Sequence, residues 1–255
     1  MLKFTALTLL AAAAASLTMF AAETNTGKEL YEMRVYYAAE GKLDALHARF
    51  RDHTMRLFEK HGIKNIGYFV PAGENPERKL VYFIKHASRD GRTKSFRAFG
   101  SDPEWQKAAK ESEKNGRLVT KIEETFMNTT DYSPMPKIEK KGGRIFELRT
   151  YTTPEGKLEN LHARFRDHTM DLFKKHGMEN VVYWVKTPDQ KDAKTTLIYL
   201  LAHQDKEARD KSFGTFRQDP DWVKAKSESE KDGSLTVDQG VKSEILVPTD
   251  YSPLK

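Results

Sequence analysis

The chain has 255 residues, of which 38% are hydrophobic, 11% aromatic and 31% charged. This length allows one large domain or two small ones with buried cores, and the composition excludes global disorder. Cysteine is absent, which excludes disulfides, thiolate metal sites and a cysteine nucleophile. The formal net charge is +6, but basic and acidic residues are interspersed, so we expect no nucleic-acid partner.

The N-terminal segment has the composition of a secretory signal peptide. Lys3 precedes an uncharged, Ala- and Leu-rich run over residues 4–22, and polar residues follow it. We therefore predict that residues 1–22 are a signal peptide and that the protein is exported, either periplasmic or secreted. The alternative is a membrane tether, since an uncleaved apolar run of about 19 residues can just span a bilayer. We expect no other membrane association.

The rest of the chain is a tandem repeat. Residues 29–134 align with residues 144–253, and the stretch HARFRDHTM occurs in both, at 47–55 and at 162–170. All eight histidines fall into four repeat-equivalent pairs. The segment between the repeats, 135–143, is charged and ends in two glycines, which is typical of a linker.

Each repeat shows the pattern strand, helix, strand, strand, helix, strand. In the first repeat, alternating or β-rich runs predict strands at 30–38, 65–70, 80–86 and within 118–128, and helical periodicity predicts helices at 40–61 and 88–114. Gly62 is placed to end the first helix, and Asp102 to cap a new helical segment that begins at Pro103. In the second repeat, strands are expected at 144–152 and 241–247.

This element order predicts an α+β fold. A βαββαβ unit forms an antiparallel four-stranded sheet with both helices on one face, the ferredoxin-like arrangement. The other face of each sheet needs a cover, and the second copy can supply it. We therefore predict two tandem ferredoxin-like domains packed sheet to sheet, as an intramolecular αβ barrel with its helices outside.

Three histidines lie on or near the apolar face of the first helix. On a helical wheel, His61 is near the centre of the apolar stripe, and His47 and His53 border it, whereas Arg49 falls on the opposite side. We interpret them as half-buried structural residues, with His61 binding carbonyls of the last helical turn. The alternative is that His53, with its equivalent His168, lines a helix–sheet pocket and moves a proton there. Their spacing does not suit a metal, and we expect no metal site.

A polar set E-x-R-x-Y recurs on the first strand of each repeat. Glu32, Arg34 and Tyr36 share one strand face, and we expect that face to lie between the two sheets. A buried Glu and Arg must pair, so the set is interpreted as an ion pair that fixes sheet register. The alternative is that Arg34, or its equivalent Arg149, holds an anionic ligand. The second repeat presents Glu147, Arg149 and Tyr151.

The middle strands carry four tyrosines, which we expect in the core or at its rim. Trp105 and Trp222 follow the capped helix starts and are expected to be packing anchors. No Ser-His-Asp order, phosphate-binding loop or dinucleotide fingerprint is present, so we assign no catalytic residue and expect no cofactor. The candidate ligand-binding residues are His53, Arg34, Tyr36, Tyr68, Tyr82, His168, Arg149, Tyr151, Tyr183 and Tyr199.

Several motifs, in order, resemble the NIPSNAP domain. In the first repeat these are YEMRVYYAAEGKLDALHARFRDHTMRLFEKHGI, IGYFV, SDPEW and TTDYSP, and in the second FELRTYTTPEGKLENLHARFRDHTMDLFKKHGM, VVYWV, QDPDW and PTDYSP. The resemblance implies the dimeric αβ-barrel superfamily, in which ferredoxin-like domains pair through their sheets. It implies no reaction, because the family has no settled catalytic residues. Its better-known animal members are mitochondrial or vesicle-associated, unlike a chain that begins with an export signal.

Two hypotheses of function follow. The first is an exported binding module for a small molecule or a protein. The second is a cofactor-independent oxygenase or isomerase that uses His53 or His168 beside Tyr and Arg, as relatives in the wider superfamily do. A cavity of about 300 Å³ or more that His53 reaches would favour the second. A structural role through self-association is a third, weaker hypothesis.

Overall fold

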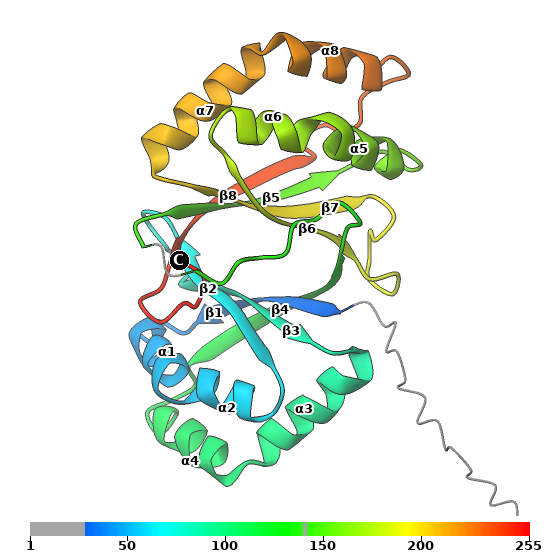
Figure 1. Cartoon of the computed structure of the whole chain (residues 1–255). Coiled ribbons are helices and arrows are strands. Elements are labelled where there is room, and N and C mark those ends of the chain that lie inside the picture. The colour runs from blue at the N-terminus through cyan, green and yellow to red at the C-terminus, as the bar shows by residue number, and fades with distance from the viewer. Residues whose placement is uncertain (1–28, 140–141) are drawn as a thin grey trace, which may run out of the picture.

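The computed structural model describes residues 29–139 and 142–255 (Figure 1). The predicted signal peptide, residues 1–22, lies outside the described residues. Within the described ranges, no helix combines the length and the apolar character needed to cross a membrane.

The predicted βαββαβ order is confirmed in both repeats. The first contains β1 (Leu30–Ala38), α1 (Leu43–Arg49), η1 (Phe50–Thr54), α2 (Met55–Lys60), β2 (Lys64–Pro71), β3 (Lys79–His86), α3 (Arg89–Ser101), α4 (Pro103–Ser112) and β4 (Val119–Thr129). The second contains β5 (Ile145–Thr152), α5 (Leu158–Arg164), η2 (Phe165–Thr169), α6 (Met170–Lys175), β6 (Glu179–Lys186), β7 (Thr196–His203), α7 (Lys206–Gln218), α8 (Pro220–Ser229) and β8 (Val241–Pro248).

The eight strands form one closed antiparallel barrel. Their order is β1-β3-β2-β8-β5-β7-β6-β4, so the last strand of each repeat pairs with the second strand of the other. The helices of the first repeat lie on one outer side of the barrel and those of the second on the opposite side (Figure 1). The predicted barrel with helices outside is thus confirmed. Because the barrel is closed, neither half-sheet has a free edge strand.

The barrel interior is filled by large apolar side chains from both repeats. Phe83 stacks on Trp184 with ring centroids 5.1 Å apart, and Phe69 contacts Phe146 at 5.0 Å. Tyr31 also belongs to this interior cluster, and Met33 and Val35 pack against it. Since strand residues alternate between faces, the polar set on β1 points the other way, toward the helices. The prediction that this set lies between the sheets is therefore wrong. Both faces of the strand are buried, so burial alone could not distinguish them.

The first helix of each repeat contains a π-helical turn, which the sequence analysis missed. It covers Phe50–Thr54 and Phe165–Thr169, the centre of the repeated stretch HARFRDHTM. The hydroxyl of Thr54 donates to the carbonyl of Arg49, five residues earlier, at 3.1 Å. A π-turn has more residues than an α-turn, so positions after it rotate away from an ideal α-helical wheel. Thr54 is buried, while His53 is half-buried.

Asp102 and Asp219 cap helices α4 and α8 as predicted, and each also holds a histidine. The Asp102 side chain accepts a hydrogen bond from the backbone N–H of Glu104 at 2.9 Å. Its other oxygen lies 2.7 Å from Nε2 of His61, and Asp219 meets His176 at the same distance. The interpretation that the His61 side chain binds carbonyls of its own helix end is therefore wrong.

The repeated stretch HARFRDHTM is the docking surface for the end of the other repeat. Asp250 accepts two hydrogen bonds from Arg51, at 2.7 and 2.8 Å, and the Tyr251 hydroxyl lies 2.7 Å from Nδ1 of His47. Ser252 Oγ accepts from the backbone N–H of Tyr68 at 2.9 Å. We call this set of contacts the reciprocal clasp, because the second repeat is held in the same way.

The second half of the reciprocal clasp uses the end of the first repeat. Asp131 binds Arg166 at 3.0 and 3.1 Å, and the Tyr132 hydroxyl lies 2.7 Å from Nδ1 of His162. Ser133 Oγ accepts from the backbone N–H of Tyr183 at 2.9 Å. Burial lowers the pKa of both His47 and His162, which favours neutral rings that can accept from these phenols. The retention of this stretch in both repeats thus has a structural reason.

We predict that Tyr251→Phe lowers the free energy of unfolding by about 1 kcal/mol, because His47 loses its hydrogen-bond partner. Urea denaturation monitored by circular dichroism measures the change. Tyr37→Phe is the matched control, since its hydroxyl also bonds a side chain, that of Glu123, but at an exposed position outside the clasp. Equal effects of the two substitutions would contradict a stabilising role for the clasp.

Candidate functional site

A buried polar network lies between the helices and the strands of each repeat. In the second repeat Glu147 is fully buried and accepts from Arg209 through both oxygens, at 2.8 Å each. Arg149 also binds Glu147, Ser243 donates to it, and His203 Nε2 lies 3.3 Å away. The predicted Glu–Arg pair therefore exists, within a larger network and on the helix side of the strand.

The first repeat contains the same network with one more carboxylate. Glu32 is bound by Arg34, by Arg92 at 3.0 and 3.1 Å, and by His86 at 3.0 Å. Arg34 pairs in addition with Glu124, which occupies the strand position of Ser243. Burial opposes ionisation of Glu32, but the hydrogen bonds from His86 and Arg92 and the charge of Arg34 outweigh it, and its pKa falls to about 2.

In each repeat two buried tyrosines stack on each other next to the polar network. Tyr183 and Tyr199 are fully buried and stack with centroids 5.0 Å apart, and Tyr68 and Tyr82 stack at 5.2 Å. The Tyr199 hydroxyl accepts from Nε of Arg149 at 2.8 Å. Burial raises the pKa of Tyr199 well above its ordinary value, so its phenol stays neutral. These tyrosines are core residues, one of the two placements expected for them.

The second repeat has a cavity of about 210 Å³ between its helices and its sheet. Arg149 and Tyr151 enter it from β5, Arg164 from α5, and Trp222 from α8. The guanidinium of Arg164 lies over the Trp222 ring at 5.2 Å, and that of Arg149 lies 5.0 Å from the ring of Phe213. The remaining lining residues are Phe165, Thr169, Phe173, Phe213, Phe216, Arg217 and Lys226.

The first repeat has a cavity of about 450 Å³ at a related place, but with a different lining. Tyr36, Arg49, Trp105 and Ala109 occupy the positions of the second-repeat lining residues Tyr151, Arg164, Trp222 and Lys226. Arg34 does not line it, and Glu113 does. The other lining residues are Arg117, Val119, Thr120, Lys121 and Ile122.

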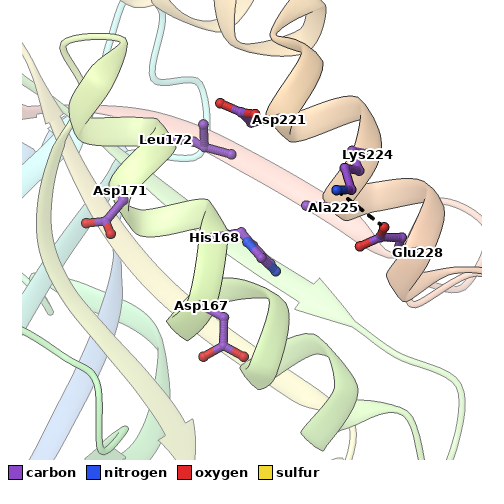
Figure 2. Close-up of a pocket in the computed structure, with 8 residues that line it drawn as sticks. All are labelled: Asp167, His168, Asp171, Leu172, Asp221, Lys224, Ala225 and Glu228. Carbon is purple, nitrogen blue, oxygen red and sulfur yellow. Dashed lines mark ion pairs between the residues drawn. The ribbon is translucent and has the colours of Figure 1, made fainter.

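Neither candidate histidine reaches a helix–sheet cavity. His53 lines none of five cavities in the described part of the chain, and His168 lines a groove of about 340 Å³ on the outer surface. Figure 2 shows His168 projecting from its helix toward α8, which carries the Lys224–Glu228 ion pair. The alternative that His168 lines a pocket between helix and sheet is therefore wrong. In the described ranges no group of His, Asp and Glu is arranged for a metal ion.

Sequence reasoning missed Arg164, Arg217 and Lys226. It placed Arg49, the equivalent of Arg164, on the solvent side of the helix, yet both are buried. The reason is that α4 and α8 cover this side: Arg49 pairs with Glu113 at 3.0 Å and Arg164 with Glu230 at 2.7 Å. The repeat alignment held a usable signal, because both Arg–Glu pairs recur at equivalent positions.

These features define the class: a single chain in which two βαββαβ repeats close one antiparallel αβ barrel. The chain belongs to the NIPSNAP family, whose model matches residues 31–134 and again 146–253. Curated protein sequences include no match to it.

Solved structures share the architecture. A protein from Lactobacillus acidophilus, provisionally named a monooxygenase, is 12% identical with a TM-score of 0.56 over 87% of this chain and 94% of that one. Another from Fusobacterium nucleatum, also provisionally named a monooxygenase, is 11% identical with a TM-score of 0.55 over 88% and 93%. A NIPSNAP family protein from Agrobacterium tumefaciens is 24% identical with a TM-score of 0.37, and it covers 42% of this chain and 97% of its own. At these identities the similarity to the first two structures shows the fold alone.

We predict that acid destabilises the protein through Glu32. Its pKa is lowered from 4.5 to about 2 in the folded state, so its contribution is complete above pH 4.5 and is lost as the pH falls toward 2. The loss amounts to about 3 kcal/mol. Urea denaturation as a function of pH should show a steeper decline in the wild type than in Glu32→Gln. Glu29→Gln, which removes an exposed carboxylate next to the same strand, should retain the wild-type slope. Parallel profiles for the wild type and Glu32→Gln would contradict the prediction.

Proposed function

We propose that the protein binds a small molecule in the helix–sheet cavity of its second repeat. The observation that carries the proposal is the lining of this cavity, in which buried arginines and aromatic rings converge on about 210 Å³ of empty space. Binding pockets combine mostly apolar walls with a few placed polar groups, which is the composition seen here. The elements that hold these side chains are a barrel strand and packed helices, so the site is preorganised.

A catalytic role for this cavity has less support than a binding role. The lining has neither a carboxylate nor an imidazole, the usual general bases, and the phenol of Tyr199 behind it is held neutral. The second candidate function remains a cofactor-independent oxygenase or isomerase, in line with the provisional names of two structural neighbours. In that case the cavity would serve as the substrate pocket, and oxygen uptake with a bound compound would reveal it.

We predict that Trp222→Ala weakens ligand binding about tenfold or more, because it removes an aromatic wall of the cavity. Trp105→Ala is a matched control: each tryptophan packs on a phenylalanine, at 4.3 Å for Trp105 and 4.4 Å for Trp222, but Trp105 lies in the other repeat. Native mass spectrometry of small molecules retained by the purified protein, followed by titration of the compound identified, provides the measurement. No retained compound and no thermal shift across a metabolite panel would overturn the proposal.

We also propose that the two repeats are ferredoxin-like domains paired as an intramolecular dimeric αβ barrel, and that the protein is exported. The first proposal is supported by the repeat topology and by the shared architecture of the neighbours. The second is supported only by the composition of residues 1–22. Intact mass spectrometry of the protein from cell-envelope fractions should give the mass of a chain without these residues. An unprocessed chain in the cytoplasm would contradict export.

A further inference from the structure

We propose that the ligand of the second-repeat cavity is a small aromatic carboxylate, and that the first repeat does not bind it. This inference rests on the proposed function and specifies its ligand. It comes from a difference in charge between two halves of one chain that otherwise have the same fold.

The first difference lies at the inner end of the cavity. In the first repeat, Arg34 and Arg92 are balanced by two carboxylates, Glu32 and Glu124. In the second repeat, Ser243 replaces the second carboxylate, and its hydroxyl donates to Glu147 instead of accepting from arginine. Arg149 therefore faces the cavity with one negative partner fewer than its equivalent.

The second difference lies at the mouth. Arg217 and Lys226 line the second-repeat cavity, whereas the equivalent positions in the first repeat are Gly100 and Ala109. The first-repeat cavity has Arg117 and Lys121 in its lining instead, but also the acidic Glu113, and Lys121 is paired with Glu123. Arg217 and Lys226 are both exposed, and within the part of the chain that the structure describes neither forms an ion pair. Arg217 lies over the Phe213 ring at 5.6 Å. Two cations without a counterion among the described residues favour an anionic ligand.

The third observation is an unpaired donor on an arginine that lines the cavity. The Arg164 side chain is 4% exposed, and its Nη1 is held by Glu230 at 2.7 Å and by Ser229 at 3.3 Å. Its Nε is buried and has no hydrogen-bond partner, and the same holds for Nε of the equivalent Arg49 in the first repeat, where Glu113 also lines the cavity. An unpaired donor on a buried cation costs free energy unless a ligand satisfies it, and a carboxylate is the geometry that a guanidinium matches best.

The lining of the cavity and its volume indicate the aromatic character and the size of the ligand. The lining contributes four cations and no acidic side chain, together with six aromatic side chains. Pockets for drug-sized ligands measure about 300–1,000 Å³, so a cavity of about 210 Å³ suits a smaller molecule, such as one planar ring with one carboxylate. Aromatic edges and faces accommodate such a ring, while the arginines bind the acid.

The test uses matched acid and amide pairs: benzoate with benzamide, salicylate with salicylamide, and phenylacetate with phenylacetamide. Binding to the purified full-length protein is measured by ligand-observed NMR titration, which detects weak complexes. We expect the acids to bind more tightly than their amides by about tenfold or more, and their binding to weaken as salt concentration rises.

Variants that copy the first repeat into the second provide the sharpest comparison. Arg217→Gly with Lys226→Ala should weaken acid binding about fivefold to tenfold, and Ser243→Glu should weaken it about tenfold by neutralising Arg149. The fold already accommodates each of these residues at the equivalent position. Lys224→Ala is the control: it removes the same charge from α8, but its side chain lies in the outer groove beside Glu228.

The outcomes separate the inference from the proposed function. The proposal that the ligand is an aromatic carboxylate would be overturned if acids and amides bound equally well, or if the copied residues left acid binding unchanged. Either result would still leave a binding site in place. Retention of a neutral compound whose binding requires Trp222 would do the same. Absence of any bound compound would overturn both. The inference is supported if the acids bind, the copied residues weaken them, and Lys224→Ala does not.

Discussion

The reciprocal clasp is the constraint on which the rest of the architecture depends. Each repeat ends in a segment that leaves its own sheet and binds the first helix of the other repeat. Strands β4 and β8 also pair with the other repeat. The last strand of each repeat and the segment that follows it therefore both bind the other repeat, and together they close the barrel. The helices that carry Arg49 and Arg164 are therefore held by two sets of contacts. The clasp binds each helix to the other repeat, and the ion pairs of Arg49 and Arg164 bind it to the ends of α4 and α8.

Barrel closure also explains where the buried charges lie. The interior takes large apolar side chains from eight strands, so the alternate residues of β1 and β5 must face the helices. A buried Glu or Arg there is tolerated only as part of a satisfied network, and Glu32 and Glu147 each receive several donors. The first repeat balances this network with Glu124. Among the described residues of the second repeat, Arg149 keeps only Glu147 as a carboxylate partner, and Arg209 pairs with Asp210 in addition.

The sequence predicted the parts of this structure that follow from local pattern. Strand alternation, the capping Asp102 and the tandem alignment were sufficient for the βαββαβ order and the barrel. The π-helical turn was not predictable in this way, because the wheel assumes a constant α-helical period and Thr54 looks like any other polar residue. The inward position of Arg49 depends on packing by α4, a tertiary contact that no local pattern encodes. Of the cavity lining, the sequence analysis named Arg149 and Tyr151 as candidates, both on strand β5. It did not find Arg164, Arg217 and Lys226, because helices distant in the chain bring them to the cavity.

A duplicated fold can vary only where variation does not disturb closure. The clasp, the stacked tyrosines and the core of the polar network are present in both repeats, and each of these sets bonds or packs across elements. Positions 217 and 226 are exposed in the second repeat and contribute to none of these contacts, and position 243 retains a hydrogen bond to the network after losing its charge. At these positions the second repeat lacks one carboxylate and carries two additional cations beside its cavity. Each repeat still supplies half of the barrel and half of the clasp, so the charges around one cavity can change while the closed structure stays the same.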